Sequence, residues 1–157
     1  MKKELFAAIR ENDEKQVANL LNENPSLASE TDERGFTPLL LASYFGFERI
    51  SEIIIQYPQG IDAQDASGNT ALMGVSFKGH AGLASLLLKH GANPDKTNFN
   101  GSTALIFAAT FGKEDIISLL LKHHADTSIA DDSGNTAADH AKMRGFSNIV
   151  SLLESKK

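Results

Sequence analysis

Five histidines are the side chains of this sequence best suited to bind a metal ion or to transfer a proton near neutral pH. His123 and His124 are adjacent, and His90 precedes His123 by 33 residues. A zinc site needs several ligands at about 2.0–2.3 Å from the metal. The sequence has no cysteine, and no carboxylate stands at a ligand spacing from these histidines. They are therefore predicted to be solvated loop residues, and no metal or cofactor site is expected.

Other residues with chemical potential lack the neighbours that a reaction needs. The run from Asp131 to Asn135 resembles part of a calcium loop, but its ligands do not alternate and no closing glutamate follows. Ser76 and Ser102 have no base placed beside them by a motif, and the chain has no glycine-rich phosphate loop and no nucleophile elbow. The sequence therefore predicts no catalytic residues and a protein that is not an enzyme.

The strongest pattern in the chain is an internal repeat. Three sets of residues recur at a spacing of 33 positions. The sets are Gly35, Gly68, Gly101 and Gly134; Thr37, Thr70, Thr103 and Thr136; and Gly46, Gly79, Gly112 and Gly145. A fixed period of this length predicts a stack of similar units in one domain rather than a core closed on itself. The predicted units are 1–31, 32–64, 65–97, 98–130 and 131–157, with polar ends on the first and last that suit terminal caps.

Each full unit has the signals of a turn followed by two helices. Asp or Asn opens the unit and glycine stands three residues later, which is typical of a β-turn. The threonine of each unit then suits a helix N-cap. The glycine of the set that begins with Gly46 suits a left-handed helix end, and Asn12 takes that position in the first unit. The second helix carries an apolar stripe, such as Leu83, Leu86 and Leu87, which no unit can bury alone.

Composition narrows the class of protein further. The net charge of −5 lies entirely within residues 1–64, which argues against nucleic-acid binding because that needs a basic stripe. The acidic part is either a solvated surface or a docking site for a basic partner. No apolar run approaches the roughly 20 residues of a membrane span, and no signal peptide is evident. A cytoplasmic location is expected.

The sequence resembles the ankyrin repeat family. The resemblance rests on Gly35-Phe36-Thr37-Pro38-Leu39 with Ala42, and on Leu86-Leu87-Leu88-Lys89 with Gly91-Ala92. It departs from the family where a histidine usually follows Thr-Pro-Leu, because Leu40, Met73, Ile106 and Asp139 stand there. The hydrogen bonds of that histidine must be absent or replaced. The resemblance implies an all-α, L-shaped solenoid of five helix-turn-helix units with projecting turns, and binding of macromolecules, mostly proteins, on a concave face of turn tips and first helices.

The positions that face such a groove carry aromatic and basic side chains. Transferred position by position, the predicted partner-binding residues are Arg34, Phe36, Tyr44, Phe45, Phe77, Lys78, Phe99, Asn100, Phe111, Met143 and Arg144. Aromatic residues together with arginine are typical of interaction hot spots. The alternative is that these rings pack between adjacent units.

The sequence thus predicts a monomeric, non-enzymatic module that binds a protein partner, and neither nucleic acid nor a membrane. Two other functions stay open at this level. The chain could act structurally by self-association of the aromatic stripe or of the weak last unit, or it could be a receptor for a small ligand. A deep closed pocket would favour the receptor, and a shallow open groove would count against it.

Overall fold

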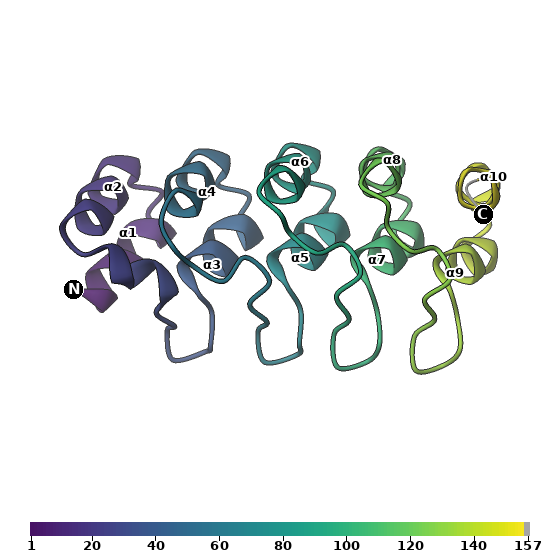
Figure 1. The fold of residues 1–157 in the computed structure, drawn as a ribbon, viewed down its shortest axis with the longest axis horizontal. Helices are drawn as coiled ribbons and strands as arrows, with labels where there is room; N and C mark the ends of the chain where they lie inside the picture. Colours follow the sequence, from purple (N-terminus) through teal and green to yellow (C-terminus); the bar gives the residue numbers. More distant parts are fainter. Residues whose placement is uncertain (156–157) are drawn as a thin grey trace.

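The computed structural model describes residues 1–155, and in this range it contains ten α-helices, one short 3-10 helix and no strand. The helices pair along the chain, and the turn loops all project to the same side of the row (Figure 1). Their bounds are α1 (Lys2–Arg10), α2 (Glu14–Glu23), the 3-10 helix η1 (Pro25–Ser29), α3 (Pro38–Tyr44), α4 (Glu48–Ile55), α5 (Ala71–Lys78), α6 (Ala81–Lys89), α7 (Ala104–Thr110), α8 (Glu114–Lys122), α9 (Ala137–Arg144) and α10 (Ser147–Glu154).

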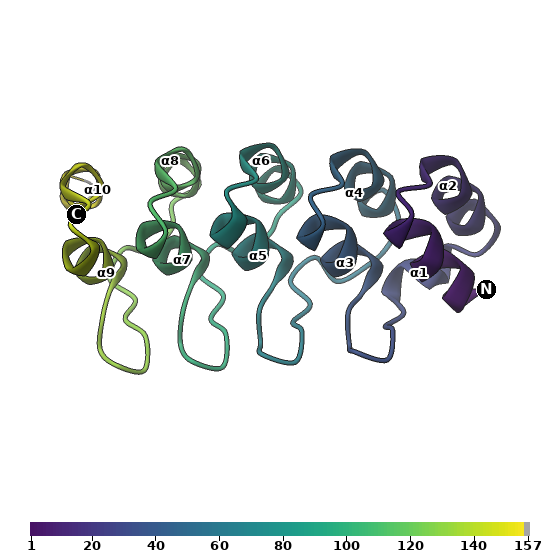
Figure 2. The same ribbon diagram turned by 180° about the vertical axis from the view of Figure 1, so that it is seen from behind.

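Helix contacts run between neighbours in sequence order. Each first helix packs against the next one, from α1 through α3, α5 and α7 to α9, and α2, α4, α6 and α8 pack in a second row. Figure 2 shows the first helices between the second helices above and the turn loops below, with the two ends of the chain at opposite ends of the row. The predicted all-α solenoid is confirmed.

The turns form as the Asp and Asn residues predict. The Asp32 Oδ1 atom accepts hydrogen bonds from the backbone amides of Arg34 and Phe36, both at 2.9 Å, and the Gly35 amide donates to the Asp32 carbonyl at 3.0 Å. Asp65, Asn98 and Asp131 repeat this arrangement. Successive turns are also bonded to each other, since the Phe99 amide donates to the Ser67 carbonyl at 3.2 Å.

All four predicted threonine N-caps are present. Each hydroxyl oxygen accepts from the amide three residues later, at 3.1–3.3 Å. Two of the residues that stand in place of the usual histidine return a hydrogen bond to the threonine amide. Asp139 Oδ2 accepts from the Thr136 amide at 3.0 Å, and the Met73 sulfur accepts weakly from the Thr70 amide at 3.4 Å. Leu40 and Ile106 carry no polar atom, so this bond is replaced in two units and absent in two.

The histidines are more structural than predicted. His140 Nε2 lies 2.7 Å from Asp131 Oδ2, and its side chain is mostly buried, so the prediction of a solvated loop residue is wrong there. The Nδ1 atoms of His90 and His123 lie 3.0 Å from the carbonyl oxygens of Leu86 and Leu119, which also accept from the backbone amides of these two histidines near the ends of α6 and α8. Each of these contacts lies within one unit, and it joins either two positions of the same helix or a helix and the turn before it.

The hydrophobic core is continuous along the row. Buried residues of the second helices, such as Ile50, Leu87 and Leu120, join those of the first helices in one cluster. The first unit contributes the apolar residues predicted from helical spacing, namely Leu5, Ala8, Ile9, Val17, Leu20 and Leu21. Burial of each such leucine or isoleucine contributes about 1.5–3 kcal/mol, and both neighbours of an inner unit are needed to provide it.

Leu87→Ala tests this core directly. Leu87 is fully buried in α6, so its truncation is expected to lower the free energy of unfolding by about 2–5 kcal/mol. The neighbouring Leu86 is only partly buried, and Leu86→Ala should cost less. Urea unfolding followed by far-UV circular dichroism measures both variants. A cost below about 1 kcal/mol for Leu87→Ala would contradict the assignment of the buried stripe.

His124→Gly tests the strain at the end of α8. His124 has φ +65°, while Gly91 at the matching position after α6 has φ +94°. An L-residue in this region is strained by about 1–2 kcal/mol, and the larger backbone entropy of glycine in the unfolded chain offsets part of the gain. We expect His124→Gly to stabilise by about 0.5–1 kcal/mol in urea unfolding. Gly91→Ala is the reverse control, since no atom lies within 4 Å of the added Cβ, and it should destabilise.

The Asp131–His140 pair is expected to contribute to the loss of folding stability at acid pH. Hydrogen bonds from the Asn135 amide and then from His140 hold the pKa of Asp131 below its ordinary value. A lowered folded-state pKa stabilises the fold above the ordinary carboxyl range, and this contribution disappears as pH falls through the folded pKa. Asp131→Asn should therefore be less stable than the natural chain near pH 7 and should lose less stability between about pH 5 and about pH 2.

Thermal unfolding at a series of pH values measures this difference. Asp132→Asn is the matched control, because its exposed side chain makes none of these hydrogen bonds. An equal acid sensitivity of Asp131→Asn and the natural chain would show that the pair contributes nothing.

Candidate interaction surface

We name the surface formed by α3, α5, α7, α9 and the turn loops before them the inner face. Six large apolar side chains on it stay exposed to solvent. Their exposed fractions are 47% for Tyr44, 44% for Phe45, 43% for Phe77, 68% for Phe99, 39% for Phe111 and 62% for Met143. All six are among the residues predicted from sequence. All of them except Phe99 stand in the last two positions of a first helix or directly after it.

The first aromatic cluster lies at α3. The Phe36 and Tyr44 ring centroids are 6.4 Å apart, and Tyr44 and Phe45 are 5.9 Å apart. Phe45 stacks on Phe47 at 5.5 Å. Phe36 and Phe47 are partly buried against the core, so Phe36 contributes to folding as well as to the surface. The rings of this cluster pack on each other within the unit 32–64, and Tyr44 and Phe45 still keep exposed faces.

The second cluster joins α5 to α7. Phe77 and Phe111 meet edge to face with centroids 4.7 Å apart, and Phe77 also contacts Phe107 at 6.4 Å. The sequence reasoning missed Phe107 and Phe47. Phe107 lies three residues after Ala104 at the start of α7, and it is partly buried against the core. The repeat offered one signal for Phe107, because Leu41 and Gly74 occupy the equivalent position in the two preceding units and Phe107 is the larger residue.

Basic side chains lie over these rings. The Lys78 Nζ atom is 4.0 Å from the centroid of Tyr44, and the guanidinium carbon of Arg144 is 5.6 Å from that of Phe111. Both contacts reach from one unit to the unit before it. Arg34 lies 6.0 Å from the Phe36 centroid within its own unit. Cations over ring faces are attracted by about 0.5–1 kcal/mol at exposed sites, so these contacts hold the rings in place.

Three predicted residues stand apart from the two clusters. Phe99 is at the tip of a turn, where a Cβ added to Gly68 would lie 2.7 Å from its ring. The Asn100 carbonyl accepts from the Asp132 amide at 3.0 Å, which ties two turns together. Met143 is exposed near the end of α9.

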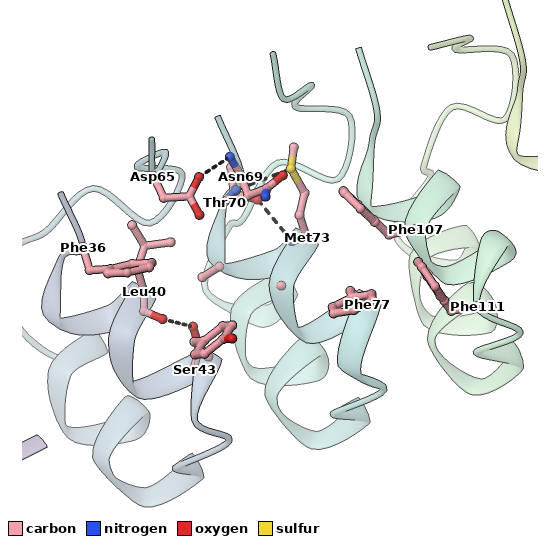
Figure 3. Close-up of a pocket in the computed structure, with 13 residues that line it drawn as sticks. Phe36, Leu40, Ser43, Asp65, Asn69, Thr70, Met73, Phe77, Phe107 and Phe111 are labelled. Atoms are coloured by element: carbon pink, nitrogen blue, oxygen red, sulfur yellow. Dashed lines mark hydrogen bonds between the residues drawn. The ribbon is translucent and has the colours of Figure 1, made fainter. Parts of the chain in front are cut away.

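A pocket of about 260 Å³ opens on the inner face between the two clusters. Figure 3 shows Phe36 and Leu40 on one side, Phe77, Phe107 and Phe111 on the other, and Asp65 and Asn69 at the turn. The full lining is Phe36, Leu40, Ser43, Tyr44, Asp65, Asn69, Thr70, Ala71, Met73, Gly74, Phe77, Phe107 and Phe111. Asp65 is the one charged residue in this set. Sequence reasoning named neither Asp65 nor Gly74 as a site residue.

Residues 1–155 contain no group of three or more His, Asp or Glu side chains placed to hold a metal ion. Within the same residues, no helix has the length and apolar character needed to cross a membrane. The pocket lining holds no histidine, the Ser43 hydroxyl donates to the Leu40 carbonyl, and the Thr70 hydroxyl oxygen caps α5.

Comparison with known families gives one match. A family model for ankyrin repeats, described as three copies, matches residues 5–98 and 75–157. No curated protein matches the chain significantly. Ankyrin repeats are generally protein–protein interaction modules and are typically non-enzymatic. The matched ranges span nearly the whole sequence, and they agree with the paired helices and projecting turns of the structure, so the chain belongs to the ankyrin repeat family.

Proposed function

We propose that this protein binds a protein partner through its inner face and has no catalytic activity of its own. The observation that carries the proposal is that six large apolar side chains stay 39–68% exposed on one face. Folding alone does not require apolar groups there. An apolar stripe framed by polar turns is typical of an interaction surface.

The arrangement of the rings suits tight binding. Aromatic side chains bury about 150–250 Å² each, and with arginine they dominate hot spots at interfaces. Here Phe77 is held by Phe111 at 4.7 Å, and Tyr44 is held by Lys78 at 4.0 Å. Rings that are already fixed lose little rotamer freedom when a partner covers them, so less of the binding energy is lost to ordering.

The pocket favours a macromolecular partner over a free small ligand. Its volume of about 260 Å³ is below the roughly 300–1,000 Å³ of typical small-molecule sites. It is also open along the inner face, between two surface clusters. Such a hollow fits one side chain of a larger partner. We further propose a monomeric protein of the cytoplasm, organised in the five units 1–31, 32–64, 65–97, 98–130 and 131–157.

The combined variant Phe45→Ala, Phe77→Ala and Phe111→Ala tests the proposed surface. The purified chain is used to capture proteins from the cell that makes it, and captured proteins are identified by mass spectrometry. We expect partner binding to fall at least about tenfold, since these three rings hold the centre of the surface. The thermal midpoint should fall by only a few degrees, because each ring is 39–44% exposed.

The matched control places alanine at Gln56, Lys89 and Lys122. These exposed residues share the repeat spacing of 33 positions; Gln56 directly follows α4, and Lys89 and Lys122 end α6 and α8, away from the inner face. The control should capture as the natural chain does. Equal capture by the aromatic variant would contradict the proposed surface, and a large loss of thermal midpoint would assign the rings to packing. Sedimentation over a concentration series separates a monomeric adaptor from a self-associating protein.

A further inference from the structure

Gly74, in the middle of α5, lines the pocket on the inner face and has no side chain to fill it. Positions 41, 74, 107 and 140 are equivalent in the repeat, and they hold Leu41, Gly74, Phe107 and His140. Gly74 does not have a positive φ, so its backbone does not need glycine. A Cβ added to it would meet nothing within 4 Å. Glycine weakens a helix interior, so neither backbone conformation nor a close contact explains Gly74, and it leaves open space in the pocket.

Asp65, which lines this pocket, differs from its counterparts in the other turns. In all four turns the Oδ1 atom of the opening Asp or Asn holds the turn, and in the other three turns the second polar atom of that side chain has another partner. Asp32 Oδ2 bonds Arg10 at 3.3 Å, Asn98 Nδ2 bonds Asn69 at 2.9 Å, and Asp131 Oδ2 bonds His140 at 2.7 Å. Within residues 1–155, Asp65 Oδ2 forms no hydrogen bond or ion pair.

The last unit shows what the third unit lacks. There a nitrogen-bearing side chain stands at the Gly74 position, and its ring nitrogen reaches the carboxylate of the turn. In the third unit the same carboxylate is present, and the side chain that would reach it is missing. The space over Gly74 and the free Oδ2 atom of Asp65 are therefore complementary to a positively charged donor supplied from outside the chain.

The walls of the pocket support the same chemistry. Phe36, Tyr44, Phe77 and Phe107 surround the space, and Figure 3 shows Asp65 near Phe36 at its turn side. Ring faces attract cations, and apolar walls suit the methylene stem of a long basic side chain. Lys78 already places its ammonium group 4.0 Å from the Tyr44 centroid, so this ring accepts a cation within the chain itself.

We infer that the pocket over Gly74 receives a lysine or arginine side chain of the protein partner, with its charged head on Asp65 Oδ2. This inference rests on the proposed function. The stem lies between the rings of Phe36 and Phe107, and the carboxylate fixes the head. A long stem is required because the partner's backbone stays outside the rings. The same pairing explains why this carboxylate has no partner in the free protein.

Three capped five-residue peptides probe the pocket. Each has glycines on both sides of a central lysine, arginine or norleucine, and norleucine keeps the apolar stem without the charge. Titration of the ¹⁵N-labelled full chain is followed by ¹H–¹⁵N NMR. We expect saturable shifts of the Asp65, Asn69 and Gly74 amides with the lysine or arginine peptide, and binding about tenfold weaker with norleucine, the size expected of one charge-assisted hydrogen bond. Equal binding of norleucine would overturn the inference.

Variants of the chain complete the test. Asp65→Asn should weaken the basic peptides about tenfold, whereas Glu33→Gln removes an equal charge from an exposed residue of the preceding turn and should leave them unchanged. Gly74→His places an imidazole where His140 stands in the last unit, and we expect it to raise the thermal midpoint and to abolish peptide binding. Gly74→Ala controls for helix propensity and should raise the midpoint while binding is largely kept. Peptide binding that survives Gly74→His overturns the inference.

The outcomes separate this inference from the proposed function. If the aromatic triple variant loses its partner while Asp65→Asn keeps it fully, the inner face binds a protein and the basic side chain is disproved. If the basic peptides bind through Asp65 and no captured protein depends on the inner face, the pocket chemistry stands and the proposed partner binding is disproved.

Discussion

The structure depends on the burial of each unit's apolar stripe against its neighbours. A helix pair of this size has two faces to cover, and α5 with α6 covers them only by packing against α3 and α4 on one side and α7 and α8 on the other. Ile54 and Leu87 stand at matching positions of successive units, and both are fully buried. Stability is therefore a sum of contacts between neighbours, and residues that face away from these contacts are left free to vary.

The turns, on the other edge of the stack, also form contacts between neighbouring units. The Asp32 carboxylate closes its own turn, and backbone bonds such as Phe99 to Ser67 connect one turn to the next. These polar groups would be costly if they were left without partners between packed units. The regular spacing of the stack is thus maintained twice, by apolar contacts along the helices and by hydrogen bonds along the turns.

The sequence was sufficient for the fold, because the residues that set it repeat in type. Thr37 and its counterparts predicted four helix starts, Asn12 predicted a left-handed helix end that has φ +56°, and the stripe around Leu87 predicted the buried face. The exposed rings of Phe45, Phe77 and Phe111 were also located correctly on the surface. Each of these inferences needs only local geometry and the repeat length.

The contacts that the sequence did not predict join side chains from two units or from two positions far apart in one unit. The His140–Asp131 pair spans nine residues, and Phe107 reaches Phe77 across units, so neither contact follows from helical spacing within one element. The pocket was missed because it depends on what Gly74 lacks. A sequence pattern consists of residues that are present. A glycine within a helix indicates only a loss of stability of about 0.5–1 kcal/mol relative to alanine.

That loss is informative once the fold is known. In a stack whose stability comes from repeated contacts, the positions under least constraint are those that face the groove, and a destabilising residue can persist there only if the neighbouring contacts tolerate it. Gly74 and the unpaired oxygen of Asp65 are two such departures, and they meet in one pocket. Two independent exceptions to the repeat at the same place are more informative about function than the exposed rings, because a ring at the end of a helix has a packing role open to it and these two features have none.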